Sequence, residues 1–257
     1  MQLDEVTISR AILETHAKLF SEYLELDIAI VGGGPSGLAC AALIAEKGLK
    51  VGIIEKKLSV GGGMWGGGMT FPRIVVQEEG KRLLDHFHIR YEEYKPGYYV
   101  ASSVESVSKL TAAACDAGAE FFNLTSVEDV VIKGDGRVSG LVITSTPVQM
   151  TGLHVDPLTL SAKVTIDATG HDAVVAHCVK KKGGAIEIRG ESFMWADRAE
   201  ANIISHTKEI FPGLIACGMA ANAVAGEARM GAVFGGMLLS GEHAADLAKT
   251  ILRDRRG

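Results

Sequence analysis

The segment at residues 27–55 constrains the fold more than any other part of the chain. It reads DIAIVGGGPSGLACAALIAEKGLKVGIIE, which is an apolar run, a glycine turn, an alanine-rich stretch and a second apolar run. This pattern predicts a buried strand, a tight turn, a helix and a second strand. Together these elements would form the opening unit of a Rossmann-type α/β sheet.

Three glycines of the turn, Gly32, Gly34 and Gly37, have the spacing GxGxxG. Such glycines allow a sharp bend, close approach of a pyrophosphate and tight packing of helix on strand, and the helix N-terminus favours the anion. Glu55 lies eighteen residues past Gly37, where a carboxylate can accept a hydrogen bond from a ribose hydroxyl. Ser36 either adds a hydroxyl at the helix start or only caps the helix. We therefore expect an ADP-containing dinucleotide at this turn.

The rest of the chain continues an α/β pattern, with no internal repeat and no linker that would divide it. The predicted elements are a helix at 6–20, a polar helix at about 76–86, short strands at 89–100, a helix near 103–117, a strand at 119–124, a hairpin at 126–145, a buried strand at 162–172, a last sheet strand at 213–226 and a long helix from about Gly235. Residues 146–162 lack a clear period and are expected to be irregular. We expect a single domain over 1–257 with an embedded β-rich insertion at about 89–160.

Charge and hydropathy exclude several classes of partner. The net charge is −5, which argues against nucleic acid and anionic membranes. No apolar run reaches the roughly 20 residues of a spanning helix, and the N-terminus lacks the layout of a signal peptide. We expect a cytoplasmic protein. The four cysteines have no metal-binding spacing and are expected to be small buried hydrophobes: Cys40, Cys115, Cys178 and Cys217.

Two later segments resemble the layout of two-dinucleotide-binding flavoproteins. Residues 164–170 read VTIDATG, and residues 213–219 read GLIACGM. In such flavoproteins the second segment ends in an aspartate that holds the flavin ribityl chain. Here the position is Met219, whose thioether cannot accept hydrogen bonds as a carboxylate does. The sequence therefore favours NAD over flavin, and an FAD-dependent oxidoreductase of the same fold is the alternative.

Other polar residues are candidates for chemistry. Asp156 and His171 are of the ligand types that suit Fe(II) with open coordination positions, although isolated residues of these types more often cap or lie on the surface. Arg229 lies between two glycine-bearing stretches, where its guanidinium could clamp a small carboxylate or simply be exposed on a helix.

Taken together, six segments resemble the thiamine thiazole synthase family, in the same order along nearly the whole chain. They are GGGPSG at 32–37, EK at 55–56, GGGMWGGGM at 61–69, DPLT at 156–159, ATGHD at 168–172 and GMAANAVAG at 218–226. The resemblance implies a Rossmann-like, glutathione-reductase-type three-layer fold that binds FAD or NAD(P) in other proteins. It also implies that NAD is consumed: nicotinamide leaves, the ADP-ribose part condenses with glycine, and sulfur entry and ring closure give an ADP-linked thiazole carboxylate.

The resemblance also assigns residues and an assembly. Asp156 and His171 match the iron ligands and Arg229 matches the residue that grips the glycine carboxylate. The positions that match NAD contacts are Ser36, Glu55, Lys56, Gly63, Val127 and Met219, which join Gly32, Gly34 and Gly37 of the glycine turn in the predicted NAD site. In the family the two ligands come from different chains, so the resemblance implies a dimer-shared site, with dimers forming an octamer.

One position departs from part of the family. Eukaryotic members have a sacrificial cysteine two residues before the aspartate, and this chain has His154 there. An imidazole has no sulfur to give. The chain thus resembles the archaeal-type branch, which takes external sulfide with Fe(II), and His154, Asp156 and His171 are its implied catalytic residues. Related archaeal chains have also been labelled ribose 1,5-bisphosphate isomerases, for which no motif is present here.

Overall fold

A central sheet of mainly parallel strands organises the molecule, in a computed structural model that describes residues 3–255. Its strand order is β10-β11-β9-β1-β2-β6, in which β10 alone is antiparallel to its neighbour. The hairpin β7–β8 joins the same sheet because β8 pairs antiparallel with the first half of β9. The bounds are β1 (Glu25–Val31), β2 (Val51–Ile54), β6 (Glu120–Phe122), β7 (Thr125–Ile132), β8 (Val138–Ser145), β9 (Leu158–Asp167), β10 (Lys208–Phe211) and β11 (Leu214–Ala216).

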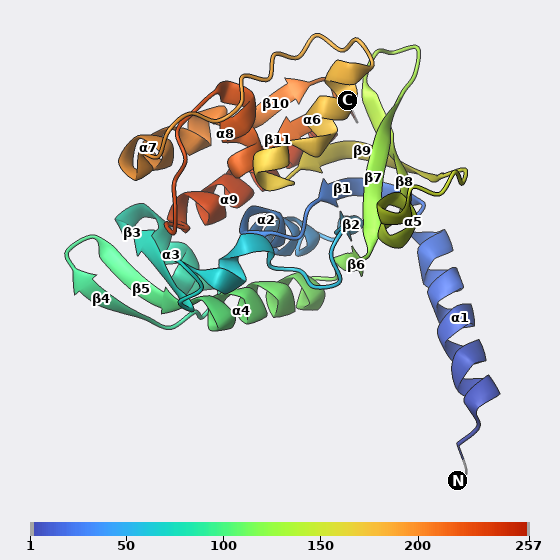
Figure 1. The fold of residues 1–257 in the computed structure, drawn as a ribbon, viewed down its shortest axis with the longest axis horizontal. Helices are drawn as coiled ribbons and strands as arrows, with labels where there is room; N and C mark the ends of the chain where they lie inside the picture. Colours follow the sequence, from blue (N-terminus) through green and yellow to red (C-terminus); the bar gives the residue numbers. More distant parts are fainter. Residues whose placement is uncertain (1–2, 256–257) are drawn as a thin grey trace.

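Helices and the β7–β8 hairpin cover the two faces of this sheet (Figure 1). On one face, an apolar core joins the sheet to helices α2 (Pro35–Ala45), α3 (Glu78–His86), α4 (Ser103–Asp116) and α9 (Gly235–Asp254). On the other face, apolar side chains of the hairpin and of α6 (Val174–Lys181) pack against the sheet. This arrangement confirms the predicted three-layer α/β fold, since each face of a parallel sheet must be covered.

A second, three-stranded antiparallel sheet lies beside α3. Its order is β3 (Arg73–Gln77), β5 (Tyr98–Ser102), β4 (Tyr91–Lys95). The segment 56–72 that leads to it contains a short 3-10 helix, η1 (Gly62–Gly66). Residues 89–160 supply strands to both sheets and also include α4 and the short α5 (Thr146–Thr151).

Several predicted elements differ in the structure. Residues 146–162 are not irregular: they contain α5 and the start of β9, which the hairpin stabilises through long-range pairing that no local pattern reveals. Residues 213–226 are not one strand, because the chain turns at Gly218, with φ 61°, from β11 into helix α8 (Met219–Ala225). The prediction also lacked β3, β10, α6 and α7 (Ala196–His206).

Helix α1 (Glu5–Glu22) projects away from the rest of the molecule (Figure 1). Its N-terminus is capped by Asp4, which accepts a hydrogen bond from the backbone N–H of Thr7. None of its residues is buried, and a set of large apolar side chains on and next to it is exposed: Leu3, Val6, Ile8, Ile12 and Leu13. Within residues 3–255, no helix has the length and apolarity needed to cross a membrane.

The cysteines divide into buried and accessible positions. Cys40 and Cys217 are fully buried, whereas Cys178 is half-buried and Cys115 is exposed, so the expectation of four buried cysteines is wrong for the last two. Cys115 lies on the outer face of α4 near its end. Burial raises the pKa of the Cys40 thiol to about 12 and that of Cys178 to about 11.

Candidate functional site

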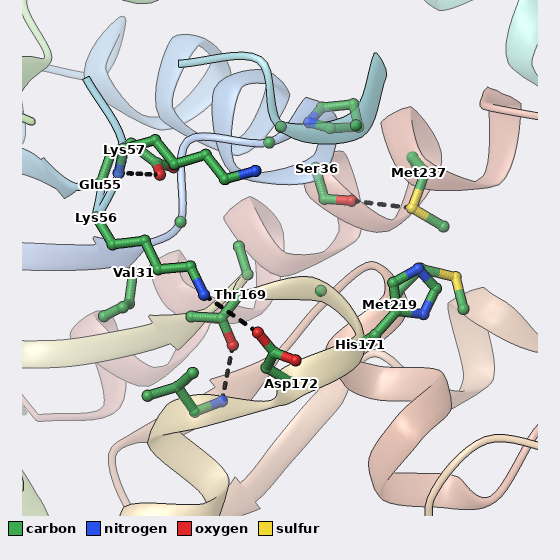
Figure 2. A pocket seen from close by; sticks show the side chains of 18 of the residues that line it. Val31, Ser36, Glu55, Lys56, Lys57, Thr169, His171, Asp172, Met219 and Met237 are labelled. Atoms are coloured by element: carbon green, nitrogen blue, oxygen red, sulfur yellow. Dashed lines mark hydrogen bonds and ion pairs between the residues drawn. The ribbon is translucent and has the colours of Figure 1, made fainter. Parts of the chain in front are cut away.

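A cavity opens at the carboxyl ends of β1, β2 and β9. Strand β1 pairs with β2 on one side and β9 on the other, so the chain order reverses around it and leaves a crevice between the following turns. The cavity has a volume of about 760 Å³. Figure 2 shows residues from the turns after all three strands around it.

The three glycines of the first turn differ in whether the structure requires a glycine at that position. Gly32 has φ 102°, and an added Cβ would lie 2.4 Å from the carbonyl oxygen of Ala168. A Cβ on Gly37 would lie 2.1 Å from the carbonyl oxygen of Gly32, so this glycine lets α2 pack against the turn and does not line the cavity. A Cβ on Gly34 would meet nothing within 4 Å and would project into open space. Gly34 is therefore the position at which the protein itself does not require glycine.

Glu55 at the end of β2 is tied to the glycine turn. Its carboxylate accepts hydrogen bonds from the backbone N–H of Gly33, at 2.8 Å, and of Lys57, at 2.8 Å. The side chain is buried but lines the cavity, and each oxygen keeps a second lone pair for another donor. Lys56 next to it forms an exposed ion pair with Asp172, 3.2 Å from Nζ to Oδ2, across the cavity (Figure 2).

The turn after β9 is held by a buried carboxylate. Asp167 accepts hydrogen bonds from the backbone N–H and hydroxyl of Thr169 and from the N–H of Ala176 at the start of α6. The Thr169 hydroxyl in turn accepts from the N–H of Val174 at 2.7 Å. Burial raises the pKa of Asp167, although these donors oppose the rise. This network fixes the 3-10 turn η2 (Gly170–Asp172), which carries His171.

His171 and Arg229 share one carboxylate. Both line the cavity, and both contact Glu191: His171 Nδ1 lies 2.6 and 2.7 Å from the two carboxylate oxygens, and Arg229 Nε lies 3.8 Å from one of them. The backbone of Arg229 is fixed by the same segment, because its N–H donates to Phe193 and its carbonyl accepts from Trp195.

The remaining predicted contacts lie around the same cavity. Ser36 is buried at the start of α2 and donates to the Met237 sulfur at 3.5 Å. Met219 begins α8, which packs against η2, and lies near His171 in Figure 2. Gly63 lines the cavity from η1 and Val127 from β7. Ten predicted residues thus gather in one cavity: Gly32, Gly34, Ser36, Glu55, Lys56, Gly63, Val127, His171, Met219 and Arg229.

His154 and Asp156 do not line this cavity. Both are exposed in the segment between α5 and β9, together with the apolar side chains of Leu153 and Val155. Among residues 3–255 of this single chain, no group of three or more His, Cys, Asp or Glu side chains could hold a metal ion. One chain therefore presents His171 at the cavity and Asp156 on an exposed surface.

Two residues of the site were missed by the sequence prediction. Asp167 ends a buried strand directly before a turn, and a charged residue at such a place is a signal that could have identified it. Glu191 offers no such signal. It lies twenty residues from His171 in a segment without regular structure, and tertiary backbone contacts, such as Ser192 with Glu227 and Met194 with Arg229, bring it to the site.

Comparison with known proteins places the chain in a family. The Thi4 family model matches residues 9–234, which is most of the chain. The chain belongs to the Thi4 family. A relative from Methanoculleus marisnigri named thiamine thiazole synthase is 69% identical over 247 residues, covering 96% of this chain and 97% of the relative. One of the same name from Pyrococcus abyssi is 56% identical and covers 95% of this chain and 96% of the relative.

A solved structure shows that the Thi4 family fold extends over nearly the whole chain. The crystal structure of Thermovibrio ammonificans THI4 is 47% identical and superposes with a TM-score of 0.96. The match covers 98% of this chain and 100% of that chain. The fold described above is thus that of a solved Thi4 protein.

Proposed function

We propose that this chain is a thiamine thiazole synthase of thiamine biosynthesis, which makes an ADP-linked thiazole carboxylate from NAD, glycine and sulfide with Fe(II). The observation that carries the proposal is that a single cavity combines a dinucleotide turn with an imidazole, His171, and a guanidinium, Arg229. The two relatives described above carry this name over 95% or more of the chain, which supports the same activity.

The dinucleotide would lie along the turns after β1 and β2. The backbone at Gly34 begins α2 and faces open space, so the pyrophosphate could approach the helix N-terminus closely. Glu55 would accept from a ribose hydroxyl, while Ser36, Lys56, Gly63 and Val127 complete the contacts around the adenosine and pyrophosphate. Met219 would contact the part of NAD nearest His171. Nicotinamide then leaves, and the ADP-ribose part condenses with glycine held by Arg229 through its carboxylate.

Iron would be held by His171 of one chain and Asp156 of a second copy. The residues fit such a site. Nδ1 of His171 contacts Glu191, which leaves Nε2 for a metal ion, and Asp156 is exposed where another chain could reach it. When bound, the ion would bring sulfide next to the glycine-derived part and offset its charge. The exposed apolar residues Leu153 and Val155 beside Asp156 support an interface there. The proposed assembly is a homodimer with shared sites, which builds an octamer.

Sulfur would come from solution. His154 stands where eukaryotic family members have a sacrificial cysteine, and burial keeps the most enclosed thiols, such as Cys40, protonated. The chain would therefore belong to the sulfide-dependent, archaeal-type branch and turn over repeatedly in the cytoplasm.

Anaerobic incubation with NAD, glycine, sulfide and Fe(II), followed by mass analysis of the products, tests this function. We expect free nicotinamide and an ADP-thiazole carboxylate in molar excess over enzyme. Nicotinamide without thiazole would indicate a hydrolase. A yellow protein with a flavin absorption band would indicate an FAD-dependent oxidoreductase, and unchanged NAD would indicate a binding or sensor protein. Each of these three outcomes contradicts the proposal.

A further inference from the structure

The carboxylate of Glu191 makes a close contact with the imidazole of His171. Both carboxylate oxygens lie within hydrogen-bond distance of Nδ1, at 2.6 and 2.7 Å. The Glu191 side chain is 13% exposed, whereas that of His171 is 54% exposed. Glu191 does not line the cavity, so it supports His171 from the protein side.

This geometry determines which ring nitrogen carries the proton. An ionised carboxylate only accepts hydrogen bonds, so two of its oxygens facing Nδ1 require an Nδ1–H. In the neutral imidazole the proton is then absent from Nε2, whose lone pair is free. Histidines that bind divalent cations almost always have this arrangement, in which an acceptor such as a carboxylate holds the second ring N–H.

The second neighbour of Glu191 contributes less. Arg229 Nε lies 3.8 Å away, at the limit of an ion pair, and its side chain is 53% exposed. Solvent screens such a contact. The carboxylate is therefore oriented mainly toward His171, and the position of Arg229 depends on the backbone hydrogen bonds to Phe193 and Trp195.

We propose that Glu191 is a positioning residue that holds His171 as the Nδ1–H tautomer, with Nε2 directed to a divalent cation in the cavity. The use of this nitrogen rests on the proposed function, whereas the tautomer itself does not. Glu191 touches neither substrate nor cation and acts through His171 alone.

Nitrogen NMR of the metal-free protein tests the tautomer directly. With 15N-labelled histidine and the His171 signal assigned through a His171→Gln variant, we expect a protonated Nδ1 and an unprotonated Nε2 in the native chain. We expect Glu191→Ala to lose this bias. A native His171 with its proton on Nε2 would overturn the proposal, and that result needs no variant to fold.

Co(II) titration by calorimetry, without substrates, provides the second measurement. Loss of the supporting carboxylate should weaken Co(II) binding by about 10- to 100-fold in Glu191→Ala. Glu191→Gln, which keeps an acceptor oxygen at the same reach, should recover part of the affinity. The matched control is Glu187→Ala, which removes an exposed partner of Arg189 in the same segment and should bind Co(II) as the native chain does.

Two results separate the proposals. Native Co(II) affinity in Glu191→Ala, or an equal loss in Glu187→Ala, contradicts a positioning role for Glu191. A native chain that shows the Nδ1–H tautomer and loses it in Glu191→Ala, but makes no thiazole, supports the positioning role while the proposed function fails.

Discussion

Three glycines of one turn show how a single residue type serves three purposes. Gly32 and Gly37 are required by the protein, since a side chain at either would collide with backbone. Gly34 is different, because an added Cβ would enter the cavity and touch no atom of the chain. Its φ of −77° is available to any residue, so a substitution there causes no backbone strain.

We predict that Gly34→Val leaves a folded protein that has lost most of its affinity for NAD. The valine side chain would occupy the space that the pyrophosphate needs. We expect the Kd for NAD to rise about 100-fold or more. This corresponds to about 2.8 kcal/mol or more of lost binding free energy, since each 1.4 kcal/mol changes Kd about tenfold. Calorimetric titration measures it. Gly37→Ala is the comparison variant for folding. It should lower the melting temperature, which Gly34→Val should not, because its Cβ meets the Gly32 carbonyl. Native NAD affinity in Gly34→Val would remove the dinucleotide from this turn.

A second prediction concerns the sulfur source. The buried Cys40 and half-buried Cys178 have pKa values of about 12 and 11, so at neutral pH neither is a thiolate able to react. A variant with all four cysteines replaced by serine or alanine should keep sulfide-dependent synthesis if it folds. The intact mass of the native chain should be unchanged after turnover. A native chain lighter by one hydrogen sulfide would contradict an external sulfur source.

At the scale of elements, α7 is attached to the start of α9 through a half-buried carboxylate. Glu200 accepts hydrogen bonds from the backbone N–H of Gly236 and from the Gln77 side chain, at 2.7 and 2.5 Å. Among residues 3–255, its other oxygen and the Gln77 side-chain oxygen have no hydrogen-bond partner. Burial raises the pKa of Glu200 to about 7. This carboxyl is therefore protonated in the folded protein over a pH range where it is ionised in the unfolded chain.

The pKa of Glu200 gives stability a pH dependence of known sign. The protonated Glu200 makes its full contribution to the free energy of unfolding below pH 4.5, the ordinary pKa of a glutamate. This contribution is lost as the pH rises to about 7. The Glu200→Gln side chain stays neutral at every pH. We therefore predict that its free energy of unfolding, relative to that of the native chain, rises by roughly 2 to 4 kcal/mol between pH 4.5 and pH 8. Denaturant unfolding at each pH measures this. Glu187→Gln is the control, since a hydrogen bond from Arg189 lowers the pKa of Glu187. A pH-independent difference for Glu200→Gln would contradict the assignment.

The elements that sequence predicts well are those whose signals are local. The strand, turn and helix at 27–55 and the final helix from Gly235 are confirmed because their periodicity and glycines act within one segment. Strand β9 begins earlier than predicted because its first half depends on pairing with β8. The site follows the same rule. Residues predicted in turns after buried strands, such as Glu55 and His171, line the cavity, whereas Glu191 reaches His171 through tertiary pairing.

At the scale of the whole molecule, the two proposed iron ligands lie on different surfaces of one chain. His171 lines the cavity, and Asp156 is exposed in another segment. A shared site makes a sharp prediction for mixed oligomers. Asp156→Ala and His171→Ala should each be inactive alone. Each variant nevertheless keeps the ligand that the other has lost.

We predict that mixing the two variants under conditions of subunit exchange restores synthesis. Half of the randomly exchanged dimers are mixed and each has one intact site of two, so about a quarter of native activity should return. Mass analysis of the product measures it. A mixture of Asp156→Ala with the double variant is the control and should stay inactive. Failure to recover activity, with subunit exchange verified by mass, would show that each site is built from one chain.

We predict that order in the exposed first helix is subject to the law of mass action. Helices gain most of their stability from packing, and α1 packs against its own chain only near its end, where Phe20 contacts Phe122. If the proposed second copy covers the exposed apolar side chains of α1, its local order becomes a function of how many chains are present. Far-UV circular dichroism on serial dilution should show a fall in helix content that begins when assembly fails and precedes loss of the α/β core. Constant helicity down to the monomer would mean that the helix stands unaided.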